Sequence, residues 1–416
     1  MEFSPFLIIV IGILITGLAL IKPLIGLVLI IFFISVARFP TVLPSFLGIF
    51  TNLSVVKLLG GITFVSVLIH GMVGKKKMRI FETKEARFFI FYLIWVVISG
   101  FTQPSSFTRE TFTKYASFAM LFYITLYLVD SPKNFRIVLW SCIISMLAAA
   151  GLAVFQHFSA EDVIRARSAF IDSNYFNFYL LPIIPVAFYR MFDENSFFKK
   201  IIAAVTVVIL ILAVIFTYSR GGMIGLVVIF LLLALNSRRK LLSFLVIAIL
   251  AGLFITYMPD YLQDRIETTG LELQEENPAS STYRRLLLSK AGLMMLRDNP
   301  IMGVGVGNFY WSVRNYVPAS AGFAHNMYVE VAAETGLVGI FLFMGMIFFT
   351  LKDLRKIIKN ASPHLKSYGL GLYVGLMGFL VSAIFLHAEY EKFLWLFIFL
   401  TICLKKLAAE SEEVVI

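Results

Sequence analysis

Long apolar runs recur along this chain, and they constrain its fold more than any other feature. A helix that crosses a lipid bilayer needs roughly 20 mostly apolar residues. Runs of this kind span residues 5–21, 24–37, 57–73, 87–101, 116–130, 136–158, 174–192, 200–218, 221–236, 241–258, 326–351, 367–386 and 390–404. Because backbone polar groups inside lipid must be hydrogen-bonded within the protein, we expect a helix at each run. The sequence therefore predicts an all-α, polytopic integral membrane protein with about 12 or 13 transmembrane helices.

The composition supports this fold class. Hydrophobic residues make up 59% of the 416 residues, the mean hydropathy is +0.88, and 15% of the residues are charged. Soluble domains carry about 25% charged residues. Both cysteines, Cys142 and Cys403, lie in apolar runs, so we expect neither a disulfide framework nor a cysteine metal site. The first run lacks a basic leading region and a small-residue cleavage site, and we expect it to be a retained helix.

The net charge of +11 would suggest a nucleic-acid partner in a soluble protein. Here the positions of the cations offer another explanation. Most Lys and Arg residues fall in alternate connections between the runs, including residues 75–87, 352–366 and 405–406, and lysine predominates there. The positive-inside rule assigns these connections to the cytoplasm. We therefore expect membrane lipids as partners and no nucleic acid.

The opposite, outer side carries fewer cations, and most of them are arginine. Topology does not require arginine there, whereas a guanidinium group binds two phosphate or carboxylate oxygens at once. The outer arginines therefore indicate an anionic ligand. The candidate binding residues are Arg165, Arg167, Arg220, Arg284 and Arg285. The alternative is that single arginines pair with acids of the same loop or with lipid headgroups.

The spacing of the runs divides the chain into four regions. Residues 1–158 are expected to form N-terminal transmembrane helices, and residues 159–258 further helices with outer arginine motifs. Residues 259–325 form a large hydrophilic loop on the outer side, and residues 326–416 form C-terminal transmembrane helices and a cytoplasmic tail. Loops of this length are commonly functional.

The large loop is predicted to contain a helix followed by a glycine turn. Residues 280–300, SSTYRRLLLSKAGLMMLRDNP, begin with Ser and Thr, carry Leu and Met at helical spacing and stop at Asn-Pro. Arg284 and Arg285 fall in the first turns, where the helix N-terminus adds partial positive charge. The apolar stripe of this helix would lie on the membrane surface or on the bundle. The next stretch, IMGVGVGNFYW, lacks the spacing and the βαβ context of a dinucleotide site, so we expect a turn that redirects the chain beside a ligand.

FTYSRGGMIGL, residues 216–226, is a tight connection between two apolar runs. It holds Arg220 at the membrane boundary, and its two adjacent glycines allow a sharp turn. An arginine that reaches out to lipid headgroups would produce the same pattern.

VIRARSAFIDSNYFNFYLLP, residues 163–182, leads into another apolar run. Arg165 and Arg167 precede Asp172 and Asn174 at the start of the predicted helix. These polar residues are candidates to support an anion site. Asp172 or the serine after it could instead cap the helix.

His325 stands where the hydrophilic loop meets the apolar run in AHNMYVEVAAETGLVGI, residues 324–340. Glu330 and Glu334 share one helix face and need partners at this depth. A histidine at a helix start can also be a cap or an interfacial hydrogen-bonding group. His325 has no second histidine three or four residues away, and the chain lacks HExxH and paired CxxC patterns, so we expect no metal site. We interpret the His387 and Glu391 pair as marking a turn.

In this order along the chain, DSNYFNFYLLP, FTYSRGGMIGL, DNPIMGVGVGNF and AHNMYVEVAAETGLVGI resemble the bacterial O-antigen ligase and O-antigen polymerase superfamily. The resemblance implies a multi-pass, metal-independent glycosyltransferase of the bacterial inner (cytoplasmic) membrane that needs no cofactor. Its active site would lie on the periplasmic or extracytoplasmic face. The enzyme would take a glycan from undecaprenyl pyrophosphate and pass it to a sugar hydroxyl of an acceptor glycolipid or of a second lipid-linked glycan.

The resemblance also assigns roles to residues. Arg220 and Arg285 correspond to pyrophosphate-binding arginines, with Arg284 as the alternative to Arg285, and His325 corresponds to the catalytic base. Isoleucine and methionine stand in IMGVG where the family often has paired leucines. A histidine near its ordinary pKa of about 6.5 accepts the hydroxyl proton at neutral pH, and attack opposite the pyrophosphate inverts the anomeric carbon. Glu330 or Glu334 would orient the base.

Two other functions stay open. A polymerase that joins lipid-linked repeat units needs the same residues and differs in its acceptor. A non-enzymatic flippase or transporter would move the lipid-linked sugar instead. Secondary transporters usually have ionisable or broken helices near the membrane midplane and matching halves, and the sequence predicts neither.

Overall fold

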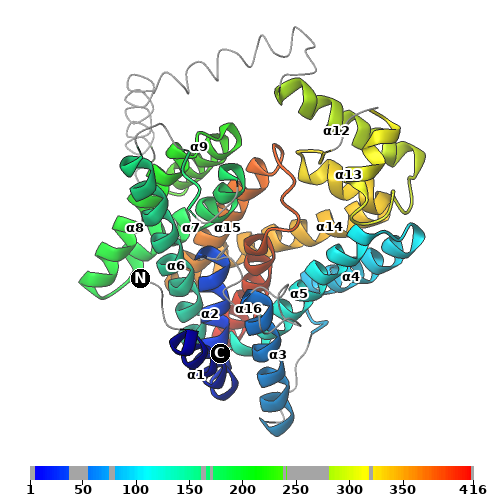
Figure 1. Cartoon of the computed structure of the whole chain (residues 1–416). Coiled ribbons are helices and arrows are strands. Elements are labelled where there is room, and N and C mark those ends of the chain that lie inside the picture. Colours follow the sequence, from blue (N-terminus) through cyan, green and yellow to red (C-terminus); the bar gives the residue numbers. More distant parts are fainter. Residues whose placement is uncertain are drawn as a thin grey trace, which may run out of the picture.

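The computed structural model describes residues 5–36, 55–74, 80–160, 165–168, 172–237, 240, 281–317 and 322–413, and these residues form helices and their connections without a strand (Figure 1). The helices are α1 (Pro5–Ile21), α2 (Pro23–Val36), α3 (Val55–Gly74), α4 (Lys84–Thr102), α5 (Ser106–Leu128), α6 (Pro132–Ser159), α7 (Ser173–Asp193), α8 (Phe197–Phe216), α9 (Arg220–Leu235), α12 (Ser281–Asp298), α13 (Phe309–Ser312), the 3-10 helix η2 (Val313–Asn315), α14 (Met327–Asn360), α15 (Pro363–Ser382) and α16 (Lys392–Glu413).

A helix occupies every predicted apolar run that falls in the described residues. The run at 241–258 lies outside them, as do residues 259–280 of the predicted large loop. Among the described helices, six are long and apolar enough to cross a membrane, namely α3, α4, α6, α8, α14 and α15. Helix α9 and residues Pro23–Ser35 of α2 are shorter and apolar. The all-α, polytopic membrane class is confirmed, whereas the expected 12 or 13 crossings stay a prediction.

Small residues let the central helices approach closely. A Cβ atom on Gly375 of α15 would lie 2.4 Å from the Pro182 carbonyl oxygen of α7. Pro182 and Pro185 both lie inside α7. In lipid, where burial of apolar surface gives little drive for helix association, such contacts supply much of the packing energy. On the other side of the bundle, Trp395 of α16 stacks on Phe118 of α5, with ring centroids 5.0 Å apart.

The connections that carry most of the outer arginines lie at one end of the helix bundle. Helices α14 and α15 meet there, since the Met327 amide at the start of α14 donates to the Ala383 carbonyl just after α15 (2.9 Å). At the other end, Arg190 late in α7 donates to Ser367 Oγ early in α15 (2.6 Å). The lysine-bearing segment 352–366 covers the last turns of α14 and the first turn of α15, at this same end. The connections with most arginine and those with most lysine therefore separate as the cation pattern predicts.

Helix α14 is broken at Gly336, one of two glycines, with Gly339, whose presence in this run allows close packing or a bend. Gly336 has φ 68° and ψ −171°, a backbone region that is almost exclusive to glycine. The groups freed by the break find partners, because Leu337 N donates to the Pro300 carbonyl (2.7 Å) and Trp95 Nε1 donates to the Thr335 carbonyl (2.8 Å). The break lies nine residues after the start of α14, so the first two and a half turns of this helix are set apart from the rest.

We expect Gly336→Ala to destabilise the protein strongly. The new Cβ would lie 2.0 Å from the Ile301 carbonyl oxygen, and alanine would be strained at this φ. Together these effects should lower the free energy of unfolding by at least about 1–3 kcal/mol. The matched control is Gly151→Ala in α6, where nothing lies within 4 Å of the new atom and stability should stay equal or rise slightly. Thermal unfolding in detergent measures both, and equal melting temperatures for the two variants would contradict the role given to Gly336.

Candidate active site

Helix α12, the glycine turn after it and the first turns of α14 form a compact unit. Leu288, Ala291 and Met295 of α12 are buried in a small core with Phe309 and with Ala333 of α14. The apolar stripe of α12 therefore packs on the bundle, which was one of its two predicted locations. Arg284 and Arg285 lie on this helix and are held relative to α14 by that core.

The predicted glycine turn is confirmed. Gly303, Gly305 and Gly307 all have positive φ values, between 69° and 86°. A Cβ on Gly303 would lie 2.4 Å from the Glu334 carbonyl carbon, so the turn passes directly over α14. The turn is also fastened to α4, since Ser99 Oγ donates to the carbonyls of Met302 and Glu334, each at 3.0 Å.

Arg220 is the first residue of α9 and follows a constrained turn. Tyr218 has φ 50°, which is uncommon for a residue with a side chain. Ser219 caps α9, because its Oγ accepts from the Gly222 amide (3.3 Å). A Cβ on Gly222 would lie 2.5 Å from the Asn177 side chain of α7. The turn can therefore lie against α7 only with glycine at this position.

The start of α7 lies beside this turn. Asp172 caps the helix, and its Oδ1 accepts from the backbone amide (2.7 Å) and side-chain amide (2.8 Å) of Asn174. The capping alternative for Asp172 is therefore what the structure shows. Arg165 links both segments: its Nε donates to the Thr217 carbonyl (2.8 Å) and its Nη2 to Asn174 Oδ1 (3.1 Å).

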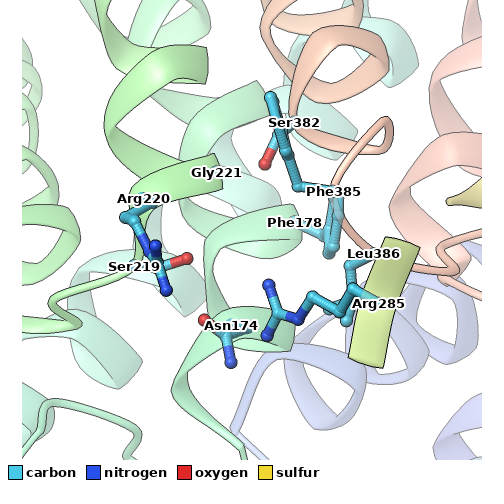
Figure 2. Close-up of a pocket in the computed structure, with 9 residues that line it drawn as sticks. All are labelled: Asn174, Phe178, Ser219, Arg220, Gly221, Arg285, Ser382, Phe385 and Leu386. Atoms are coloured by element: carbon cyan, nitrogen blue, oxygen red, sulfur yellow. The ribbon is translucent and has the colours of Figure 1, made fainter. Parts of the chain in front are cut away.

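Arg220 and Arg285 come from different helices and line one cavity (Figure 2). Figure 2 shows the two guanidinium groups reaching toward the same space from α9 and α12, with Asn174 beside them. Arg220 Nη1 also lies 3.5 Å from Thr282 Oγ1 of α12. The other lining residues, which include no acid, are Phe178, Ser219, Gly221, Ser382, Phe385 and Leu386. The cavity measures about 20 Å³, room for about one water, so the arginine side chains must move apart to admit a larger anion.

Three of the five arginine candidates lie outside this cavity lining: Arg165, which reaches the lining residue Asn174, and Arg167 and Arg284. Arg284 is exposed on α12, and Arg167 is exposed in the segment before α7. Of the adjacent pair on α12, the structure therefore brings Arg285 to the cavity, while Arg284 adds charge nearby.

His325 is half-buried just before α14 and has φ 50°. Asn326, not His325, caps this helix, because Asn326 Oδ1 accepts from the amides of Tyr328 (3.0 Å) and Val329 (3.2 Å). The Nδ1 atom of His325 is buried without a hydrogen-bond partner among the described residues. Residues held at uncommon backbone angles cluster at active sites.

The pKa of His325 differs from the ordinary value expected from the sequence. Burial, followed by the positive charges of Arg285 and Arg284, lowers the pKa of His325 from 6.5 to about 4, against an opposing effect of Asp172. The expected pKa near 6.5 is therefore wrong for the protein without substrate. His325 is neutral at pH 7 and has a ring nitrogen able to accept a proton.

Glu330 and Glu334 hold backbone groups, and neither is hydrogen-bonded to His325 in the described structure. Glu330 Oε2 accepts from the Ala324 amide (2.9 Å), next to the histidine in the chain. Glu334 Oε1 accepts from the Phe309 amide (3.1 Å), and its Oε2 accepts from the Tyr390 hydroxyl (3.1 Å). Glu330 thus positions the segment that carries His325, whereas Glu334 fastens the end of the glycine turn.

His387, which the sequence analysis interpreted only as marking a turn, lies beside His325. It lies in the connection after α15, and its ring centroid is 6.0 Å from that of His325. It stacks on Phe323 at 4.1 Å. Burial and the nearby His325 and Lys114 keep the pKa of His387 well below its ordinary value. The sequence held one signal for this pairing. His325 precedes one apolar run, His387 follows another, and both lie on the predicted outer side.

Residues 205–344 match the family model for O-antigen ligase. This segment is similar to O-antigen ligase. No curated protein matches the chain. The O-antigen ligase segment covers about a third of the sequence and includes Arg220, Arg285, the glycine turn and His325. Arg165, Arg167, Asp172, Asn174 and His387 lie outside it.

The similarity of this segment to O-antigen ligase, together with the apolar helices, is typical of a membrane-embedded enzyme of glycosyltransferase type. The described residues contain no group of three or more His, Cys, Asp or Glu side chains that could hold a metal ion. The cationic groups that converge in the site are guanidinium groups of the protein itself.

Proposed function

We propose that this protein transfers a glycan en bloc from undecaprenyl pyrophosphate to a sugar hydroxyl of an acceptor glycolipid, as an O-antigen ligase does. The reaction would take place at the outer face of the bacterial inner membrane. The observation that carries the proposal is that Arg220 and Arg285 meet in one cavity near His325, within the segment that matches O-antigen ligase.

Arg220 and Arg285 suit a pyrophosphate leaving group. Guanidinium groups donate paired hydrogen bonds to phosphate oxygens and stay charged when partly dehydrated. Charge on the pyrophosphate increases as its bond to the sugar breaks, so cations fixed at this point bind the transition state more tightly than the substrate. Asn174 adds a donor to this cavity, and Arg165 with Asp172 holds Asn174 in place. Arg284 and Arg167 would attract the anion from outside the cavity.

His325 is proposed to be the general base. The acceptor oxygen forms a bond to the anomeric carbon, and the bond from that carbon to the pyrophosphate oxygen breaks with its electron pair. The hydroxyl proton passes to the neutral His325 and from there to solvent, which leaves undecaprenyl pyrophosphate as the second product. Entry opposite the leaving group inverts the configuration. No cofactor or metal takes part in this scheme.

Glu330 and Glu334 would support the base indirectly. Glu330 holds the Ala324 amide and so fixes the backbone on one side of His325, while the Asn326 cap fixes it on the other. Glu334 holds the turn that connects α12 to α14. These contacts would hold Arg285 on α12 in a fixed position relative to His325 before α14.

The decisive experiment is transfer by the purified protein with an undecaprenyl-pyrophosphate glycan as donor. Two acceptors are offered in separate reactions, a lipid A core and a second lipid-linked glycan, each with and without chelator. We expect transfer that chelator does not reduce, and the preferred acceptor distinguishes a ligase from a polymerase. Binding of the donor without any transfer would instead support a flippase or transporter.

A further inference from the structure

A second cavity has His387, but not His325, in its wall. It has a volume of about 520 Å³ and lies between α2, α3, α5, α7 and the connection from α15 to α16. Cavities of roughly 300–1,000 Å³ are typical of small-molecule sites. One part of its wall is aliphatic, with Ile34 of α2 and Leu121 of α5. Another part carries Lys114, Tyr175, His387 and Tyr390.

His387 forms part of this wall and is fixed from two directions. The Tyr175 hydroxyl is hydrogen-bonded to His387 Nδ1 (3.0 Å), and Phe323 stacks on its ring. Phe323 lies two residues before His325. The short segment 323–325 therefore contacts the His387 ring through both Phe323 and His325. The His325 and His387 rings meet edge to face, with an interplanar angle of 68°. His325, whose pKa is lowered by Arg285, therefore contacts His387, and His387 forms part of the wall of the second cavity.

The charges of the second cavity differ from those of the arginine cavity. Its cations are Lys57, Lys114 and Lys392, and the acids Glu110 and Glu391 line it as well. Lys114 Nζ is 3.0 Å from Glu110 Oε1 and also lies 4.8 Å from the centre of the Tyr390 ring. Mixed charge of this kind suits hydroxyl groups better than a pyrophosphate. An aliphatic wall continuous with a polar, aromatic wall suits an amphipathic molecule.

We propose that the second cavity binds the acceptor, a glycolipid whose sugar contacts His387 and whose lipid portion lies along the aliphatic wall of α2 and α5. This inference rests on the proposed function. His387 and Tyr175 would hydrogen-bond to the acceptor sugar and present its hydroxyl to His325. The donor pyrophosphate and the acceptor then approach the base from two separate cavities. An in-line displacement requires the acceptor hydroxyl and the leaving pyrophosphate to lie on opposite sides of the anomeric carbon, and this proposal places them in different cavities.

A pair of neighbouring glycines offers a direct test. Gly60 of α3 lines the second cavity, whereas Gly61 does not, and nothing lies within 4 Å of a Cβ on either residue. Gly60→Phe should place a ring in the cavity and raise the acceptor KM by roughly tenfold or more. It should leave the donor KM and donor binding unchanged. Gly61→Phe is the matched control and should behave as wild type.

His387→Ala and Tyr175→Phe test the polar wall. Each should raise the acceptor KM by roughly tenfold, the usual effect of losing one hydrogen bond to a substrate, with little change in donor KM. His387→Gln, which retains hydrogen-bonding atoms, should restore part of the loss. Melting temperatures establish that the variants are folded.

Two results would overturn the acceptor assignment while leaving the proposed function intact. One is active transfer by Gly60→Phe with an unchanged acceptor KM. The other is a rise in donor KM that equals the rise in acceptor KM for His387→Ala. If the wild-type protein binds donor and transfers nothing, it is the proposed function that fails, because the acceptor has then never been tested.

Discussion

Replacing Arg220 or Arg285 with alanine should lower the rate of glycan transfer by roughly 10²- to 10³-fold, the usual effect of removing one preorganised donor from a developing anion. Both guanidinium groups line the same cavity, and no acid does so among the described residues. The loss should fall mainly on kcat, because charge on the leaving pyrophosphate grows as the reaction proceeds. Single-turnover transfer from a purified undecaprenyl-pyrophosphate glycan measures this rate directly.

The chain supplies matched controls for these variants. Arg284 is adjacent to Arg285 but exposed and outside the cavity lining, so Arg284→Ala should lower the rate much less. Arg297 lies on the same helix and pairs with Asp298 (3.0 Å), and Arg297→Ala should have little effect. Arg285→Lys keeps the charge and loses the paired donors, so we expect an intermediate rate. If Arg284→Ala is as damaging as Arg285→Ala, net charge rather than directed binding explains the arginines.

The sequence could predict the elements of this site because each has a local signal. The apolar runs predict helices, and within the described residues helices occur at those runs. The alternate glycines after α12 predict a turn, and all three have the positive φ that explains them. The outer arginines could be selected as a set because topology does not require arginine there, and the family resemblance then singled out Arg220 and Arg285, with Arg284 as the alternative.

The way these elements meet could not be read from the chain. The break at Gly336 depends on the Pro300 and Ile301 carbonyls, which approach α14 from the preceding loop. Glu330 was expected to orient His325 directly, and it holds the Ala324 amide instead. His387 is more than 60 residues from His325 in sequence and reaches it because α14 and α15 meet at one end. Local patterns carry no information on such contacts between helices.

Alanine at His325 should lower kcat by roughly 10²- to 10⁴-fold, the range that general-base assistance supplies. Donor binding should remain, because the arginine cavity does not include His325. His325→Gln keeps a polar side chain of similar reach without a basic nitrogen, and we expect it to be as inactive as alanine. Equilibrium binding of the donor, measured beside the transfer rate, separates loss of the base from loss of the fold. Wild-type kcat in either variant would remove His325 from the mechanism.

The pH dependence of transfer tests the same histidine without a mutation. Burial and the charges of Arg285 and Arg284 place the pKa of His325 at about 4 in the free protein, so its basic form is lost only as the pH falls toward that value. A bound pyrophosphate offsets the arginine charges, while Asp172, Glu330 and the neighbouring His387 stay as they were. The pKa should therefore rise in the complex.

Since kcat/KM reports the free enzyme and kcat reports the complex, the acid limb of kcat should lie at a higher pH than the acid limb of kcat/KM. Arg285→Ala removes the larger of the two arginine effects on His325, so it should bring the two limbs closer together. Acid limbs that coincide in the wild-type protein would mean that the pyrophosphate does not bind where these arginines act on the base.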